Sequence, residues 1–499
     1  MPANELTYVP GRPERNGWIF GLTTPQLVIC LLCIVPILML FGAEQARLGV
    51  ALLVPAAVVV ALTVVPVRGR PAATWLADAV MFGTGRSTGW SSWQSKVAAG
   101  LPVDPDEPDL PGALSRLEFI AGPAMPDHGR VCLIHDTAEG RWGATARLSA
   151  RGVGLASAVE CRNLAMGLRD MLKGLAASDR VDRASLVVRS VPDDGTAYDL
   201  WHERHRVCDA PELAVTVAEQ MRRTAGAAAT RTEAFLTVSA SDEVLRRPAK
   251  AAGGGSFGRG HALHRALGAL VGPLQQMGCD APQWLRQGGL SEAIRAGFNP
   301  AAAAGLTQRR LEQGDPGPPA AVAGPSRAPS PGPRAYHHDG YVTVSYAVLP
   351  PSDGVEFGSL APLMAVRTSG ERRSLAVHYE VLDARMAARI AKHERQATTV
   401  KGSVKAQQGF GEAAKDVQDR GSSYRQEHAI AAGEAMVRYA LVVSVTVPET
   451  WNVEDHAEAL EASAGGQYRL VRLELAQDSG FFAANLPLGL GLTRLRSAL

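Results

Sequence analysis

The sequence predicts an α+β protein with a two-helix transmembrane hairpin near its N-terminus and two cytoplasmic, ferredoxin-like α+β units with antiparallel sheets. Three observations lead to this prediction. Two uncharged apolar runs lie close together within residues 26–67, strand-like and amphipathic helical segments alternate after them, and runs rich in Pro and Gly separate the parts. A chain of 499 residues is expected to form several domains.

The predicted division follows changes of composition along the chain. It comprises an N-terminal cytoplasmic segment (1–25), the hairpin (26–67), a juxtamembrane amphipathic segment and linker (68–112), a first α+β domain (113–250), a Gly-rich link with a helical region (251–300), a Pro/Ala/Gly-rich linker (301–340) and a second α+β domain (341–499). The second domain includes a long polar helical stretch at 384–435.

The composition excludes some classes of protein. Lys and Arg total 51 against 49 for Asp and Glu, so the net charge of +2 does not favour nucleic-acid binding through bulk charge, and we expect no direct sequence-specific contact with nucleic acid. The six cysteines show no repeated spacing, which is not typical of a disulfide framework and fits a reducing compartment for the main body.

The hairpin consists of two uncharged runs, 26–43 and 48–67. Each is near the ~20 residues that a helix needs to cross the hydrocarbon core of a bilayer. Because only four residues separate them, the two helices must be antiparallel neighbours. A cleaved signal peptide is the less favoured alternative, since its apolar region is shorter and is not followed at once by a second span.

Flanking cations predict the orientation. Arg12 precedes the hairpin and Arg68 and Arg70 follow it, whereas Arg47 in the turn is offset by Glu44, so the positive-inside rule places both termini in the cytoplasm of a multi-pass inner-membrane protein. The residues expected to contact lipid at the interface are Arg12, Trp18, Arg47, Arg68, Arg70, Trp75, Trp90 and Trp93. The segment 71–96 is interpreted either as a helix on the inner membrane surface or as a helix packed on the next domain.

Period-2 and helical patterns predict the elements of the two α+β units. In the first unit we expect strands at 116–120, 131–135, 144–149, 184–191 and 232–239, with helices at 156–177 and 211–224. In the second unit we expect strands at 341–349, 374–381, 438–447 and 468–476, with a helix at 453–463. Helices returning to an antiparallel sheet are typical of an α+β fold.

Three segments are predicted to be linkers. Residues 98–112 are rich in Pro and acids, 251–261 are rich in Gly and form a flexible link, and 314–340 are so rich in Pro, Gly, Ala and Ser that they are not expected to bury a core. A helical region is expected at 262–277 and 290–296.

The polar stretch 384–435 has two interpretations. Its apolar positions are mostly Ala, so a solvated helix face is preferred, and a helical hairpin that grips a partner is the alternative. The basic side chains available for such a contact are Arg385, Arg389, Lys392 and Arg395.

Motifs for catalysis are missing or incomplete, so we predict neither an enzyme nor a bound cofactor or metal. No Gly-Lys pair occurs, which excludes a phosphate-binding loop of the G-x-x-x-x-G-K-[ST] type. Gly253, Gly255 and Gly258 match G-x-G-x-x-G without the preceding strand that a dinucleotide site requires. His202 and His205, near Cys208, have the spacing of metal ligands, but surface histidines beside a buried cysteine are the preferred interpretation.

The hairpin followed by Gly69, Arg70, Pro71 and Trp75 resembles the small PrgI-like inner-membrane subunits of Gram-positive conjugation and type IV secretion systems. The rest resembles actinobacterial membrane proteins of about 500 residues encoded beside conjugation-type ATPases, on the stretches 339–364, 372–383 and 477–492. The last stretch, with Phe481, Phe482, Pro487 and Gly489, is similar to the close of the N-terminal domain of those ATPases, without their motor domain.

This resemblance implies an inner-membrane scaffold or ATPase-docking subunit of a type IV-like secretion apparatus. Its expected partners are membrane lipid, a separate hexameric conjugation-type ATPase and other secretion subunits in an oligomeric assembly, with Phe481 and Phe482 available for partner contact. Two alternatives remain open: an EccE-like subunit of a type VII secretion system, and a membrane-tethered enzyme or sensor.

Overall fold

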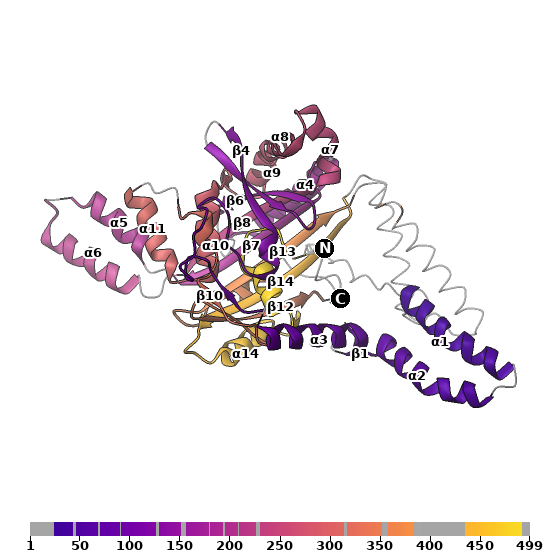
Figure 1. Ribbon diagram of the computed structural model, residues 1–499. Coiled ribbons are helices and arrows are strands. Elements are labelled where there is room, and N and C mark those ends of the chain that lie inside the picture. Colours follow the sequence, from indigo (N-terminus) through magenta and orange to yellow (C-terminus); the bar gives the residue numbers. More distant parts are fainter. Residues whose placement is uncertain are drawn as a thin grey trace, which may run out of the picture. The chain divides into compact units, whose positions relative to one another are not determined.

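The computed structural model separates into two compact units, a helical unit and a sheet unit (Figure 1). The described residues of the helical unit are 24–42, 46–67, 70–89 and 389. Those of the sheet unit are 91–125, 129–150, 156–178, 180–192, 195–207, 209–225, 230–313, 317–351, 358–382, 387 and 435–491.

The helical unit begins with two antiparallel apolar helices, α1 (Thr24–Gly42) and α2 (Ala46–Val64). The side-chain amide of Gln26 donates to the carbonyl of Thr63 at 2.7 Å, which joins the start of α1 to the end of α2. After a pair of two-residue strands, β1 (Pro66–Val67) and β2 (Arg70–Pro71), the helix α3 runs over Ala72–Thr88. The two helices therefore form an antiparallel pair.

Length and apolar character distinguish the two helices. Among the described residues, only Arg47–Val64 of α2 is long and apolar enough to cross a membrane, and the apolar part of α1, Val28–Gly42, is shorter. Large apolar side chains such as Leu32, Met39 and Val54 are exposed on both helices.

The sheet unit is built on an 11-stranded antiparallel sheet among the described residues. Its strands, in the order of the sheet, are β11 (Tyr336–His338), β12 (Tyr341–Leu349), β14 (Val437–Pro448), β13 (Arg372–Val381), β7 (Arg183–Pro192), β8 (Thr230–Ser241), β6 (Arg141–Leu148), β5 (Gly129–Asp136) and β4 (Leu117–Met125). Two short strands, β15 (Arg469–Arg472) and β9 (Gln283–Trp284), pair with β12 and β6. The mixed α+β class with antiparallel strands is thus confirmed.

The prediction of two separate sheets is wrong, because β7 of the first predicted unit pairs with β13 of the second. The pairing runs over eight residue pairs, from Arg373 with Ser190 to Glu380 with Arg183. The backbone groups on the facing edges of β7 and β13 are satisfied by this ladder, and each strand is covered on both faces. One continuous sheet therefore joins parts of the chain that lie far apart in the sequence.

Helices cover both faces of this sheet. The neighbouring residues Phe235 and Leu236 point to opposite faces of β8 and belong to different cores. The helices against the core of Leu236 include α4 (Ala158–Ala177), α8 (Gly255–Gly268) and α9 (Val271–Gln276). The core of Phe235 contains side chains of the short 3-10 helix η1 (Gly112–Arg116), α10 (Gln287–Phe298) and α15 (Gln477–Asn485). A third core packs α14 (Val453–Ser463) against β12 and β14.

Four further α-helices lie in the described part of the sheet unit. These are α5 (Thr196–His205), α6 (Glu212–Ala225), α7 (Asp242–Ala251) and α11 (Ala302–Gln313). The predicted strands and the helices at 156–177, 211–224 and 453–463 agree with the structure to within a few residues, except that β9, β10 (Arg327–Ala328), β11 and β3 (Trp93–Gln94) were not predicted and β15 is shorter than expected.

The predicted linkers 98–112 and 314–340 contain buried side chains where they are described, which is contrary to the expectation for 314–340. In 98–112, Leu110 is buried and the Asp109 carboxylate accepts from the amide of Lys96 at 2.6 Å. In 314–340, Tyr336 and the small side chains at 320, 321, 323 and 328 enter the core, because alanine fills narrow gaps that a larger side chain could not. Composition alone does not reveal this burial.

The Gly-rich segment 251–261 is a tight connection between two helices. Gly253, Gly254 and Gly255 all have positive φ, at 101°, 73° and 60°, and turn the chain from α7 into α8. A Cβ atom on Gly258 would lie 2.4 Å from the carbonyl oxygen of Ala249, so only glycine permits this approach of the two helices. The stretch 384–435 lies outside the described residues, apart from 387, 389 and 435.

The segment formed by α15 and the residues up to 491 lies on a polar strip of the sheet. Gln477, at the start of α15, accepts from the amide of Ser345 at 2.8 Å. Asn485, at its end, accepts from the hydroxyl of Ser374 at 2.7 Å and donates to that of Ser444 at 2.9 Å. The two amides thereby tie α15 to β12, β13 and β14.

The neighbouring strands are tied to the segment after the helix. Thr145 of β6 and Thr237 of β8 both donate to the carbonyl of Pro487, at 2.7 and 3.0 Å. The buried hydroxyl groups of Thr145 and Thr237 therefore find an acceptor in this segment.

Replacing Asn485 by alanine is expected to lower the free energy of unfolding by about 2–4 kcal/mol, because two buried hydroxyl groups lose a partner and a small cavity forms. Guanidinium titration followed by tryptophan fluorescence measures the change. The exposed Gln308→Ala is the control and should shift stability by less than about 0.5 kcal/mol. An Asn485→Ala variant as stable as the wild type would contradict this role for α15.

Candidate functional site

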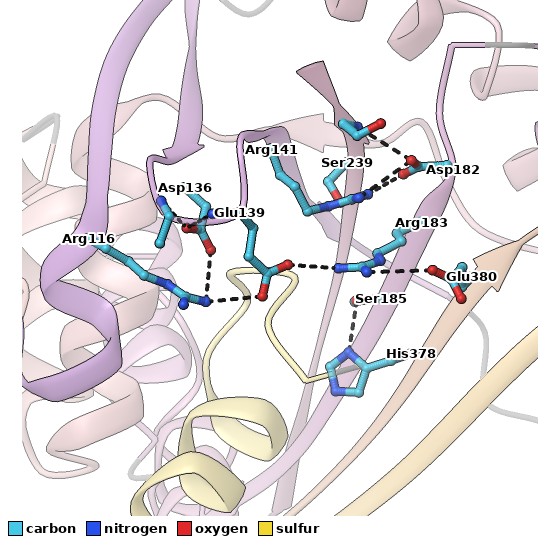
Figure 2. Close-up of polar contacts among 12 residues, drawn as sticks. Arg116, Asp136, Glu139, Arg141, Asp182, Arg183, Ser185, Ser239, His378 and Glu380 are labelled. Atoms are coloured by element: carbon cyan, nitrogen blue, oxygen red, sulfur yellow. Dashed lines mark hydrogen bonds and ion pairs between the residues drawn. The ribbon is translucent and has the colours of Figure 1, made fainter. Parts of the chain in front are cut away.

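A chain of alternating charges crosses one end of the sheet (Figure 2). Arg116 contacts the carboxylates of Asp136 at 3.0 Å and Glu139 at 3.3 Å. Glu139 also contacts Arg183 at 3.1 Å, and Arg183 contacts Glu380 at 3.5 Å. This row of charges links η1, β5, β7 and β13. It lies at the end of the sheet where the polypeptide leaves β13 and where β14 begins.

A second pair in the same region joins β6 to the start of β7 (Figure 2). The guanidinium of Arg141 pairs with the carboxylate of Asp182 and donates to the hydroxyl of Ser239 at 3.3 Å. Burial lowers the pKa of Arg141, and the charge of Asp182 opposes that shift. Each carboxylate of the network is engaged by an arginine, so the arrangement holds strand ends together rather than presenting a free acid or base.

His378 lies beneath α15 beside this network (Figure 2). Its Nε2 is 3.2 Å from the carbonyl of Ala483 and its Nδ1 is 2.9 Å from the hydroxyl of Ser185. Because a carbonyl only accepts, the proton lies on Nε2 and the hydroxyl of Ser185 donates to Nδ1. Burial lowers the pKa of His378 to about 4, so the ring is neutral at pH 7.

His338 on β11 is buried in the same way. Its Nδ1 lies 2.5 Å from the carbonyl of Phe298 and its Nε2 lies 2.8 Å from the hydroxyl of Thr343. Burial and the charge of Arg372 lower the pKa of His338 to about 3. Both histidines therefore act as neutral hydrogen-bonding groups inside the fold.

Several exposed apolar side chains of the sheet unit, including the most exposed of its described large apolar residues, Leu213, lie on α5 and α6, which Figure 1 shows extending away from the sheet. On α6, Leu213, Val217 and Met221 follow each other at intervals of four residues and so share one face of the helix, and Leu213 and Met221 are 76% and 58% exposed. On α5, Trp201 is 58% exposed and stacks on His205. We call the side chains of Trp201, Leu213, Val217 and Met221 the apolar surface.

The residues predicted to contact lipid differ in their positions in the structure. Arg12, Trp18, Arg68 and Trp90 lie outside the described residues. Arg47 is exposed in the first turn of α2, Arg70 forms part of β2, and Trp75 is half-buried on α3. Trp93 is partly buried, because β3 pairs with β10 and the Trp93 side chain packs on the core of the sheet unit.

Two of the six residues predicted to contact a protein partner are buried. Phe481 and Phe482 are buried in the core of the sheet unit, where they pack on Phe298 and Tyr336, so the prediction of an exposed contact there is wrong. The reason is that α15 presents both rings to neighbouring elements of its own chain. Arg389 is exposed. Arg385, Lys392 and Arg395 lie outside the described residues.

The weaker chemical motifs do not assemble into a site among the described residues. His202 and His205 lie on α5, where His205 donates to the carbonyl of Trp201 at 2.8 Å, and Cys208 is outside the described part. The structure brings together no three metal-ligating side chains in the part of the chain that it describes. The apolar surface was missed by sequence reasoning, although the spacing of Leu213, Val217 and Met221 within the predicted helix 211–224 is the signal that reveals it.

Comparison with known proteins adds no assignment, because no protein family and no curated protein matches the chain.

The buried histidines predict how stability depends on pH. The pKa of His378 is about 4 in the folded protein and about 6.5 in an unfolded chain, so between these values only the unfolded chain binds the proton. The free energy of unfolding is then expected to fall as the pH drops from about 6.5 towards about 4, by about 3 kcal/mol in total.

Denaturant titrations between pH 4 and 7 test this expectation. In His378→Gln, the slope of the free energy of unfolding against pH is expected to be smaller, by the contribution of about one proton. His338→Gln should act in the same direction, because the pKa of His338 is also lowered. A His378→Gln variant with the pH slope of the wild type would show that this ring does not resist protonation in the folded protein.

Proposed function

We propose that this protein is a non-enzymatic inner-membrane scaffold that docks a separate ATPase in a type IV-like, conjugative secretion apparatus. The observation that carries the proposal is the apolar surface of α5 and α6. Apolar side chains that follow one face of an amphipathic helix and remain exposed are typical of a surface that a partner covers.

The membrane part of the proposal rests on the helical unit. The apolar side chains of α1 and α2 are exposed on the surface of the unit. Exposure of apolar surface is unfavourable in water but not in lipid. We propose that both helices cross the inner membrane, with both termini in the cytoplasm. On α3, Leu76, Val80 and Met81 are exposed at helical spacing, which supports a location on the inner membrane surface.

The assignment to a conjugative apparatus rests on the resemblance to PrgI-like subunits and to the proteins encoded beside conjugation ATPases. A hexameric ATPase of that kind is the partner proposed for the apolar surface, together with other secretion subunits in an oligomeric assembly. The continuous sheet is consistent with two ferredoxin-like halves that have joined edge to edge through β7 and β13. An FtsK-like ATPase as partner would instead favour a type VII, EccE-like subunit.

The membrane proposal predicts that the full chain stays in the membrane pellet after washing with alkaline carbonate. Val54→Arg places a charge near the middle of α2 at a cost of about 2.5–3.5 kcal/mol in lipid, so a larger fraction of this variant should be released. Val159→Arg, an exposed position on α4 of the sheet unit, is the control and should remain in the pellet.

Protease treatment tests the orientation. The sheet unit should be cleaved in inverted membrane vesicles and protected in intact spheroplasts. Cleavage of the sheet unit in intact spheroplasts would contradict the proposed orientation. Full release of the wild-type chain by carbonate would contradict the membrane location.

The docking proposal predicts that crosslinking in mild detergent recovers a hexameric ATPase with the full chain. Leu213→Glu combined with Met221→Glu should reduce this recovery about tenfold or more, because two of the four side chains of the surface become charged. Thermal stability should change little, since both side chains are exposed.

Val159→Glu is the matched control, because Val159 is also apolar and 60% exposed but lies on α4. Failure to recover an ATPase with the wild-type chain under crosslinking would exclude the scaffold role. Equal recovery with the α6 variant would exclude the apolar surface as the docking site.

A further inference from the structure

Five arginines gather around two glutamates at the opposite end of the same strands from the network of Figure 2. We call this group the arginine cluster; its members are Arg147, Arg189, Arg231, Arg310, Arg372, Glu233 and Glu292. They come from the strands β6, β7, β8 and β13 and from the helices α10 and α11. Sequence reasoning did not group them, since they lie far apart along the chain.

Arg189 is one of two fully buried members and is held by helix ends as well as by charge. Its guanidinium donates to the carbonyl of Ala293 in the second half of α10 at 3.0 Å and to that of Asn485, the last residue of α15, at 3.2 Å. The C-terminal ends of helices carry a partial negative charge that favours a cation. Arg189 also pairs with Glu233 at 2.8 Å, and burial lowers the pKa of Arg189.

Arg372 is the other buried member. It donates to the carbonyls of Ala296 at 2.7 Å and Gly297 at 2.5 Å, again at the end of α10. Burial lowers the pKa of Arg372 to about 9, so the group still carries its charge at pH 7. The inner half of the cluster is therefore positive and is stabilised mainly by carbonyl dipoles.

The outer half reaches solvent. Arg147, Arg231 and Arg310 have side chains 25%, 32% and 37% exposed. One oxygen of Glu292 accepts from both Arg147, at 3.4 Å, and Arg310, at 3.0 Å. Glu233 lies between Arg231, at 3.0 Å, and Arg189. Each glutamate thus bridges two arginines.

The cluster has more positive charge than its own carboxylates balance. Five guanidinium groups face two carboxylates, a formal excess of three positive charges. In addition, the buried Nε–H groups of Arg147 and Arg231, on the outer side, have no hydrogen-bond acceptor in the described part of the chain. The same holds for Arg116 and Arg183 in the network of Figure 2, so the excess of positive charge is what distinguishes the cluster. Such buried N–H groups are costly and favour an additional anionic acceptor.

We propose that a carboxylate from an acidic helical segment of a partner protein binds at the outer face of the arginine cluster, between Arg147, Arg231 and Arg310. A planar carboxylate repeats the bridging that Glu233 and Glu292 already make, and arginine forms strong bidentate pairs with such groups.

The surroundings favour a protein as the source of the carboxylate. The helix α11, which carries Arg310, packs on α5, and α6 leads into β8, which begins beside Arg231. The apolar surface of these helices would bind the apolar face of the same segment, so the inference rests on the docking role proposed above.

Fluorescence anisotropy with the full chain in lipid nanodiscs tests the site. The probe is a labelled amphipathic peptide with leucine on one face and glutamate beside it, and the comparison peptide has glutamine in place of glutamate. The glutamate peptide should bind more tightly, and added salt should weaken its binding. Arg231→Gln and Arg310→Gln should each weaken it about tenfold, as expected for the loss of one charged hydrogen bond.

Arg259→Gln is the matched control, because the Arg259 side chain is 31% exposed and pairs with Asp242 away from the cluster, so binding should not change. Arg310→Lys keeps the charge, should leave thermal stability unchanged, and should still weaken binding because lysine cannot form the bidentate pair.

Three results would overturn the inference. The first is that the glutamate peptide does not bind the wild-type chain, and the second is that the two peptides bind equally well. The third is that inorganic phosphate displaces the glutamate peptide and binds more tightly than the peptide does. The docking role is judged separately by recovery of the ATPase with the α6 variant. If recovery is lost there while the arginine-dependent peptide binding persists, the carboxylate site stands.

Discussion

Gln477 and Asn485, at the two ends of α15, hydrogen-bond to serines of β12, β13 and β14, and Pro487 accepts from threonines of β6 and β8. The strands of this face carry hydroxyl groups where most sheets carry aliphatic side chains. A buried hydroxyl without a partner costs about 1–3 kcal/mol, so the sheet could not be dry without this segment. The same segment supplies the acceptors for His378 and Arg189.

Charged side chains gather at both ends of the central strands, but in different proportions. At the end that contains Glu139 and Arg183, positive and negative groups alternate and pair with one another in comparable numbers. At the other end the glutamates are outnumbered, and the helix α10 directs its carbonyls at Arg372. One end is therefore closed by its own charges, whereas the other can gain from an anion.

Much of the fold could be predicted from the sequence because its strands alternate regularly and its helices are amphipathic. The pairing of β7 with β13 could not, since each strand by itself indicates only that both its edges need partners. The burial of Phe481 and of the alanine-rich residues near 320 could not be predicted either, because composition does not show which surface covers a segment. For the site, the spacing on α6 was visible, but its exposure and the arginine cluster depend on tertiary structure.

The pairing of β7 with β13 also determines the order in which the sheet can be completed during translation. The strands β4 to β8 are synthesised first and can form half of the sheet, but the outer edge of β7 keeps its amide and carbonyl groups unpaired until β13 has left the ribosome. An open edge of this kind is prone to pair with other chains. The segment that seals the hydroxyl-rich face follows later still, so the first half of the sheet must remain soluble while it waits for the second.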